Sequence, residues 1–257
     1  MKGVILAGGT GTRLYPLTAS INKHMLPVGK YPMIMHGIAR LKQAGIRDIL
    51  IVVGKQHAWA MLHLLGSGEQ YGVTITYRVQ ETSGGIADAL RLARGFVGDG
   101  NVTVLLGDNI FTHSLESAVH RFEQEQLGAK VFLKKVADPS RFGVPTLMNE
   151  RIHSIEEKPV IPQSDFAVTG IYMYSSSVFS IIDTLSPSER GELEITDINN
   201  VYISQSQLDY ECIEGEWIDA GTHQSLSRAQ AMATDMQLEN ILTKPVRQIE
   251  QEVMTNS

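Results

Sequence analysis

The sequence VILAGGTGTRL, residues 4–14, joins a short apolar run to a loop with three glycines and a cation, Arg13. The run at residues 4–7 is typical of a buried β-strand. A glycine-rich loop after such a strand lies at the carboxyl edge of an open α/β sheet, where ligands bind and backbone amides suit phosphate oxygens. The stretch therefore predicts an α/β fold in which this loop is either a structural turn or a phosphate-binding loop.

The loop matches neither common phosphate-binding motif. A dinucleotide fingerprint, G-x-G-x-x-G, would start at Gly9 but has Leu14 in place of its third glycine, where only a small residue allows close helix–strand packing. The Gly-Lys-Ser/Thr of a P-loop does not occur near the loop. The first mismatch argues against a nicotinamide-dependent dehydrogenase.

Two cations make the phosphate-binding interpretation more specific. Arg13 follows the last glycine by two residues, and a guanidinium can bind phosphate with two hydrogen bonds. Lys23 stands in NKHMLPVG, residues 22–29, where proline and glycine indicate an irregular loop. We expect both cations to lie beside the glycine loop.

The spacing of apolar residues predicts a layered α/β domain. Strands are expected at residues 4–7, 48–53, 73–80, 102–106, 129–136, 152–155, 167–174 and 209–214. Helices are expected at residues 33–44, 57–65, 86–96, 115–125, 176–185, 192–205 and 223–239. Strict alternation up to about residue 128 indicates a parallel sheet covered on both faces. The later, irregular order makes the whole a three-layer α/β/α Rossmann-like fold with a mostly parallel, mixed sheet.

The chain reads as one domain, residues 1–240, with a short tail at residues 241–257. No linker, repeat or low-complexity tract divides the first 240 residues. The tail is polar with scattered apolar residues, and a docked helix and a disordered segment fit it equally well.

Composition narrows the class of protein. The net charge of −6 argues against a nucleic-acid partner, which usually requires a basic face. No apolar run reaches the ~18 residues of a membrane helix, and the N-terminus reads as a strand and not as a signal peptide. The single cysteine, Cys212, rules out an internal disulfide, and a reducing cytoplasm is the expected location.

Two aspartates stand at the ends of probable strands. Asp108 follows the strand at residues 102–106, and Asp219 lies in WIDAGT, residues 217–222, before an expected helix. A structural role, as a turn residue or a helix cap, is the alternative interpretation of each. If the two meet, they would suit Mg²⁺, which proteins often bind through one or two carboxylates together with substrate phosphates.

The sequence resembles the sugar-1-phosphate nucleotidylyltransferase family, and within it the short-form glucose-1-phosphate thymidylyltransferases. The resemblance covers roughly residues 1–230. It rests on the motifs at residues 6–14, 79–80, 85–87, 107–109, 141–144, 156–159, 168–172, 190–197 and 219–223, with Lys23 in K-x-x-L-P. Longer members carry a C-terminal helical portion that helps form a second nucleotide site, and this part of the resemblance is missing here.

The resemblance implies a role for each matching residue. Nucleotide-binding residues would be Leu6, Gly8, Gly9, Thr10, Gly11, Thr12, Arg13, Gln80, Gly85 and Asp108. Residues for the sugar phosphate would be Asn109, Gly143, Glu157, Lys158, Val168 and Thr169. Catalytic residues would be Arg13, Lys23, Asp108 and Lys158, and the Mg²⁺ ligands would be Asp108 and Asp219. Residues 1–128 would then bind the nucleotide and residues 129–240 the sugar, in a homo-oligomer, commonly a dimer or tetramer.

The implied reaction is Mg²⁺-dependent transfer of a nucleotidyl group from dTTP to α-D-glucose 1-phosphate, which releases pyrophosphate. Its nucleophile is a phosphate monoester, mostly dianionic at neutral pH because its second pKa is near ~6, so no general base is required. We expect a single in-line displacement that depends on positioning and fixed cations. Use of UTP or another sugar 1-phosphate stays open, as does a non-catalytic regulator that binds nucleotide sugars on the same fold.

Overall fold

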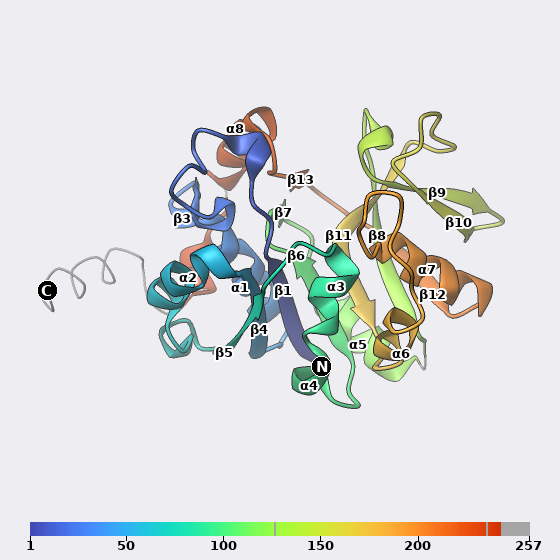
Figure 1. The fold of residues 1–257 in the computed structure, drawn as a ribbon, viewed down its shortest axis with the longest axis horizontal. Coiled ribbons are helices and arrows are strands. Elements are labelled where there is room, and N and C mark those ends of the chain that lie inside the picture. Colours follow the sequence, from blue (N-terminus) through green and yellow to red (C-terminus); the bar gives the residue numbers. More distant parts are fainter. Residues whose placement is uncertain (126, 235, 243–257) are drawn as a thin grey trace, which may run out of the picture.

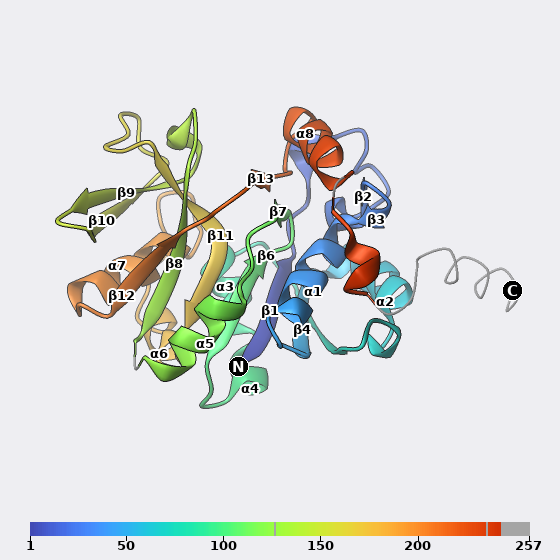
Figure 2. The same cartoon turned by 180° about the vertical axis from the view of Figure 1, so that it is seen from behind.

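The computed structural model describes residues 1–125, 127–234 and 236–242, which form a nine-stranded mixed sheet with helices on both faces (Figures 1 and 2). The sheet contains β1 (Lys2–Ala7), β4 (Asp48–Gly54), β5 (Thr74–Gln80), β6 (Val102–Leu106), β8 (Ala129–Lys135), β9 (Gly143–Met148), β10 (Arg151–Glu157), β11 (Phe166–Tyr174) and β12 (Leu208–Cys212). Two small ribbons pair β2 (Pro27–Val28) with β3 (Tyr31–Pro32) and β7 (Asn109–Phe111) with β13 (Trp217–Asp219). The helices are α1 (Met33–Gln43), α2 (Ala58–Leu65), α3 (Ile86–Arg91), α4 (Arg94–Val97), α5 (Glu116–Gln124), α6 (Val178–Ile182), α7 (Ile195–Ser204) and α8 (His223–Ala233).

The first half of the sheet is parallel, in the order β5-β4-β1-β6. Ile5 in β1 lies opposite Ile51 in β4 and Leu105 in β6, and all three are buried. These strands are apolar on both faces because helices cover both, as expected for a doubly wound sheet. The carboxyl ends of β1 and β6 therefore meet at one edge of the sheet.

The second half of the sheet turns antiparallel at β11. The C-terminal end of β11 pairs with β6, while β8 runs antiparallel along the same strand with a register shift between Val168 and Tyr172. At Val168, β11 also pairs with Gly143 of β9. β11 thus joins the parallel half of the sheet to the β9–β10 hairpin. The expectation of a mostly parallel, mixed sheet is confirmed.

The helices bury the two faces of the sheet in separate cores. One core packs α1, α2 and α5 against the strands, and the other packs α3, α6 and α7. A third, smaller core lies under the glycine loop and contains Leu14, Val28 and Ile218 together with residues of α8. The third core is what fixes the loop above the sheet edge.

Most of the expected elements are present, with two kinds of difference. The helix expected at residues 86–96 is divided into α3 and α4, because the chain tightens there into i→i+3 hydrogen bonds such as Ala93 N–H to Leu90 O, 2.9 Å. The strands β2, β3, β7, β9 and β13 were not expected: four have only two or three residues, and β9 contains Pro145. Beyond Leu242, the tail at residues 241–257 lies outside the described residues.

Leu14, which stands where a dinucleotide fingerprint has its third glycine, is a buried anchor of the loop. Its side chain is fully buried in the third core. We predict that Leu14→Ala lowers the free energy of unfolding by about 2–5 kcal/mol, the usual cost of such a cavity. Urea denaturation measures it, with Leu17→Ala, whose side chain is 45% exposed, as the matched control. Equal effects of the two substitutions would contradict the anchoring role.

Candidate active site

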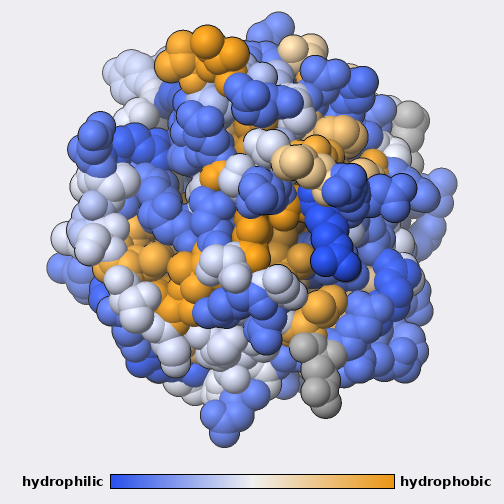
Figure 3. All heavy atoms as spheres, turned by 90° about the vertical axis from the view of Figure 1, so that its right-hand side faces the viewer, coloured by the Kyte–Doolittle hydropathy of each residue, from blue (hydrophilic) through white to orange (hydrophobic). Residues whose placement is uncertain are grey.

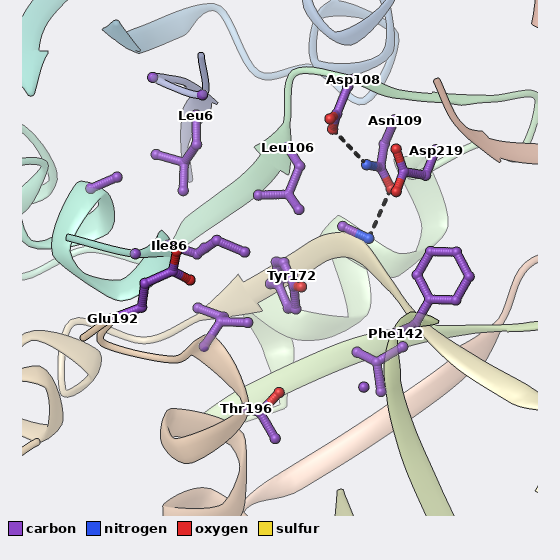
Figure 4. A pocket seen from close by; sticks show the side chains of 18 of the residues that line it. Leu6, Ile86, Leu106, Asp108, Asn109, Phe142, Tyr172, Glu192, Thr196 and Asp219 are labelled. Carbon is purple, nitrogen blue, oxygen red and sulfur yellow. Dashed lines mark hydrogen bonds between the residues drawn. The ribbon is translucent and has the colours of Figure 1, made fainter. Parts of the chain in front are cut away.

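A cavity of about 370 Å³ opens at the carboxyl ends of β1 and β6 and extends toward the β9–β10 hairpin. Its lining includes residues expected at the site: Leu6, Gly8, Gly9, Arg13, Lys23, Gln80, Gly85, Asp108, Asn109, Gly143, Glu157, Lys158, Val168 and Asp219. Figure 4 shows side chains from both halves of the sheet around it. Thr10, Gly11, Thr12 and Thr169 do not line it.

The glycine loop lies against the cavity with its backbone. A Cβ on Gly9 would lie 3.4 Å from Lys23 Nζ, so the absence of a side chain gives the lysine room beside the loop. Gly11 has a positive φ of 71°, which favours glycine, and its carbonyl accepts hydrogen bonds from Leu14 N–H and Thr18 Oγ1. Thr10 and Thr12 are exposed.

The lysine loop is tied to the end of β1 by a buried asparagine. Asn22 Nδ2 donates to the carbonyl of Ala7, and Asn22 Oδ1 accepts from the backbone N–H of His24 at 2.8 Å. The His24 ring is also held by Asn22 Oδ1, with Nδ1 at 2.7 Å. Burial, with Lys23 beside it, lowers the pKa of His24 to about 3, so this ring is neutral at physiological pH. No sequence motif predicted that this histidine lines the cavity.

Asp108 and Asp219 are brought together by the pairing of β7 with β13. In this ribbon Asp219 lies opposite Asn109, and the N–H of Ala220 donates to the carbonyl of Asp108 at 2.8 Å. Neither aspartate caps a helix: the N-cap of α8 is Thr222, whose side chain forms a capping box with Ser225, and β7 follows Asp108 directly. Figure 4 shows the two carboxylates on one side of the cavity.

The two carboxylates have opposite pKa shifts. Burial acts to raise the pKa of Asp108, but the ion pair with Lys23 overcomes it and holds the pKa well below its usual range. Burial and then the neighbouring charge of Asp108 raise the pKa of Asp219. Lys23 and Arg13 act to lower the pKa of Asp219, but they offset burial and the charge of Asp108 only in part.

Arg13 and Gly221 complete this cluster. A Cβ on Gly221 would lie 2.8 Å from Asp219 Oδ1, 3.0 Å from Arg13 Nη2 and 3.5 Å from Asp108 Oδ2. The guanidinium thus lies close to both carboxylates, and only a residue without a side chain fits where they converge. Two anions and two cations therefore lie close together in the cavity wall.

The carboxylates of Asp108 and Asp219 suit Mg²⁺ as two protein ligands that act together with substrate phosphates. Within the described residues, no group of three or more His, Cys, Asp or Glu side chains is arranged to hold a metal. The two carboxylates provide oxygen ligands, and a divalent cation would relieve the repulsion between them. Magnesium ions are commonly held by one or two carboxylates plus substrate phosphates, so the two aspartates fit the ion expected from the sequence.

At one end of the cavity, Gln80 at the end of β5 faces the glycine loop. Gln80 Nε2 donates to Asp88 Oδ2 at 2.9 Å and to the carbonyl of Gly85 at 3.5 Å. Ile86 and Leu106 form apolar walls beside it. The result is a slot with one oriented amide and apolar surfaces, which suits a flat heterocycle.

At the other end, the carboxylate of Glu157 ends β10 and Lys158 follows it. Glu157 Oε2 accepts from Thr196 Oγ1 at 2.7 Å, and Lys158 Nζ lies 3.2 Å from Glu157 Oε1. Lys158 has a positive φ of 48°, an uncommon conformation for a lysine. Its N–H donates to the carbonyl of Phe142 at 2.9 Å, which fixes the strained residue at the cavity.

Val168 and Thr169 show the alternation of a strand. Val168 lines the cavity, whereas the hydroxyl of Thr169 donates to the carbonyl of Phe132 at 2.9 Å and is fully buried. Successive side chains of a strand point to opposite faces, so the two residues could not both face the cavity. The expectation for Thr169 as a sugar-pocket side chain does not agree with this geometry.

Asn109 organises the floor of the cavity. Its Oδ1 accepts from Gly170 N–H at 2.9 Å and from Trp217 Nε1 at 2.7 Å, while Nδ2 donates to Asp108 Oδ1 at 3.1 Å (Figure 4). Phe142 packs edge-on against Trp217 with ring centroids 5.3 Å apart. Sequence reasoning assigned no role to Phe142, Tyr172, Thr196 or Trp217, although each lies in or next to a motif that it had singled out.

Comparison with known proteins agrees with the fold and the motifs. A family model described as nucleotidyl transferase matches residues 2–236. A glucose-1-phosphate thymidylyltransferase of Neisseria meningitidis is 42% identical over 241 residues, which cover 92% of this chain and 84% of that protein. One from Mycobacterium tuberculosis is 43% identical over 230 residues, or 88% of this chain and 80% of the relative.

Solved structures show the same architecture. A Bacillus anthracis protein, proposed to be a glucose-1-phosphate thymidylyltransferase and crystallised with sucrose, has a TM-score of 0.89 and 56% identity and covers 92% of this chain and 96% of its own. A UDP-glucose pyrophosphorylase in complex with UDP-glucose has a TM-score of 0.81 at 22% identity, with coverage of 91% and 98%, and shares the fold alone. The chain belongs to the nucleotidyl transferase family.

Proposed function

We propose that the chain transfers the dTMP group of dTTP to α-D-glucose 1-phosphate and releases pyrophosphate. The observation that carries the proposal is that one cavity contains the glycine loop, the cations Arg13, Lys23 and Lys158, and the two neighbouring aspartates. The same cavity has a slot suited to a heterocycle at one end and a polar pocket at the other. The glucose-1-phosphate thymidylyltransferases that resemble this chain over most of its length support the choice of substrates. Residues 1–128 hold the nucleotide, and residues 129–240 supply the sugar pocket.

The reaction brings two polyanions together, so catalysis is mainly electrostatic. The phosphate of the sugar phosphate attacks the α-phosphorus of the triphosphate in line with the leaving pyrophosphate. Arg13 and Lys23 lie beside the glycine loop and stabilise the charge that develops on the α-phosphate and on the leaving group. Lys158 holds the attacking phosphate, and Glu157 and Val168 line the sugar pocket. No side chain has to remove a proton from the nucleophile.

Asp108 and Asp219 would hold Mg²⁺, which neutralises phosphate charge when bound. Asp108 forms an ion pair with Lys23, and both side chains line the cavity in which the phosphates would lie. The N–H of Gly221 donates to Asp219 Oδ1 at 2.9 Å and keeps the second carboxylate in place. A triphosphate carries more negative charge than one Mg²⁺ neutralises, so Arg13 and Lys23 would supply further positive charge beside the phosphates.

The first test is pyrophosphate release with Mg²⁺, measured for dTTP, UTP, CTP, ATP and GTP against a panel of sugar 1-phosphates. We expect release only when both substrates are present, and most rapidly with dTTP and glucose 1-phosphate. A preference for UTP or another sugar phosphate would reassign the substrates within the same chemistry. No release from a folded protein that binds dTTP would contradict catalysis and favour a regulator that binds nucleotide sugars.

Removal of either catalytic cation beside the loop is expected to slow turnover without unfolding the protein. Arg13→Ala and Lys23→Ala each reduce kcat by about 10²-fold or more, the scale of losing one preorganised electrostatic contact. Circular dichroism and steady-state kinetics measure the two effects. Lys30→Ala is the matched control, because the Lys30 side chain is 83% exposed and forms its ion pair with Glu239, away from the cavity. Wild-type turnover in Arg13→Ala or Lys23→Ala would remove that residue from the mechanism.

The metal assignment predicts a shift in magnesium dependence. Chelation of divalent cations should abolish pyrophosphate release, and added Mg²⁺ should restore it. Asp219→Asn removes one of the two proposed carboxylate ligands and is expected to raise the Mg²⁺ concentration for half-maximal rate by about tenfold or more. Asp183→Asn, at an exposed aspartate that pairs with Arg94, is the control. An unchanged Mg²⁺ dependence in Asp219→Asn would exclude Asp219 as a ligand.

A further inference from the structure

The amide of Gln80 is held in one orientation by the acidic side chain of Asp88. Two acceptors, Asp88 Oδ2 and the carbonyl of Gly85, face the same end of the amide, and only Nε2 can donate to them. The amide oxygen consequently lies at the other end, beside the glycine loop, where a Cβ on Gly8 would approach Oε1 to 2.5 Å. Gln80 is 9% exposed, so the orientation is set by these contacts and not by solvent.

The oxygen of this amide is available to a ligand. Within the described part of the chain, Oε1 of Gln80 accepts no hydrogen bond, and both Gln80 and Gly8 line the cavity. A heterocycle in the slot therefore meets a hydrogen-bond acceptor at this position. The ring N3 of thymine or uracil carries a hydrogen and can donate, whereas N3 of cytosine is itself an acceptor.

Asp88 is fixed in turn by Arg91. Arg91 Nη2 lies 2.5 Å from Asp88 Oδ1, so each carboxylate oxygen has its own donor, Arg91 on one side and Gln80 on the other. Gly84 leaves room for this arrangement, since a Cβ there would lie 2.7 Å from Asp88 Oδ2. The Asp88 side chain is only 17% exposed, whereas that of Arg91 is 51% exposed.

We propose that Asp88 is a positioning residue that selects the nucleobase: it turns the acceptor of Gln80 toward the base and so favours bases with a hydrogen on N3, thymine and uracil, over cytosine. The inference rests on the proposed function, because it needs the base to lie against Gln80. It assigns to Asp88 no contact with the nucleotide. A mismatch at this point would leave two buried acceptors facing each other, a cost that lowers the affinity for CTP.

The test substitutes Asp88→Asn and compares kcat/KM for dTTP and CTP with glucose 1-phosphate. Asparagine has one oxygen, which the positively charged Arg91 retains, so the asparagine Nδ2 faces Gln80. The Gln80 amide then turns over and offers Nε2 to the base. We expect the dTTP-to-CTP ratio to fall by about tenfold or more, mostly through KM, with circular dichroism unchanged.

Arg91→Ala is the matched control, because it removes the other partner of Asp88 and leaves both carboxylate oxygens to Gln80. Its dTTP-to-CTP ratio should stay within about twofold of wild type. Asp88→Ala, which leaves the amide only its long hydrogen bond to the carbonyl of Gly85, should also lower the ratio. An unchanged ratio in both Asp88 variants, with dTTP and CTP slowed alike, would overturn the proposal and leave Asp88 a structural residue.

The outcome can be separated from the proposed function. Wild-type protein that releases no pyrophosphate with any nucleotide would contradict the proposed function. Calorimetric binding of dTTP and CTP to the wild type and to Asp88→Asn then still tests the base selection. Wild-type activity combined with an unchanged preference in the Asp88 variants would overturn this inference alone.

Discussion

Two carboxylates buried side by side are the constraint on which the rest of the site depends. Asp108 and Asp219 carry like charges at short range, and burial and then the charge of Asp108 raise the pKa of Asp219. Lys23 and Arg13 offset this repulsion in part, and both must therefore be held close by their loops. The buried Leu14 and the hydrogen bonds of Asn22 do this, so apolar packing outside the cavity determines where the charges lie.

The sheet forms the apolar core of the molecule, and the loops at its edge carry the polar residues of the cavity. The parallel strands bury apolar side chains on both faces and leave their carboxyl ends free for polar residues. The antiparallel strand β11 then brings the β9–β10 hairpin to the same edge (Figure 1). Figure 3 views the side of the molecule on which this hairpin lies, where apolar patches interrupt a hydrophilic surface. No helix in the described residues is long and apolar enough to cross a membrane.

Elements with strong periodicity were predictable, and elements defined by a partner were not. The apolar runs of β1, β4 and β6 predicted the parallel half of the sheet, because a strand that is apolar on both faces must be buried on both faces. β7 and β13, which pair in one ribbon, are too short to show a periodic pattern of apolar residues. The contact between Asp108 and Asp219 was therefore only a hypothesis. The alternation of a strand already implied that Val168 and Thr169 face opposite ways. The orientation of Gln80 by Asp88 depends on a turn whose geometry no motif specifies.

The pairing of β13 with β7 has a consequence for the order in which the protein is made. It joins Trp217 to Asn109, residues 108 positions apart, and it supplies the second carboxylate of the cluster. A chain emerging from the ribosome has its glycine loop, Lys23 and Asp108 long before Asp219 is synthesised. Because such a distant contact closes a long loop, it forms late, and the partial chain has half of the charge cluster without its counterpart. The complete binding centre is therefore a signature of a chain translated at least through α8.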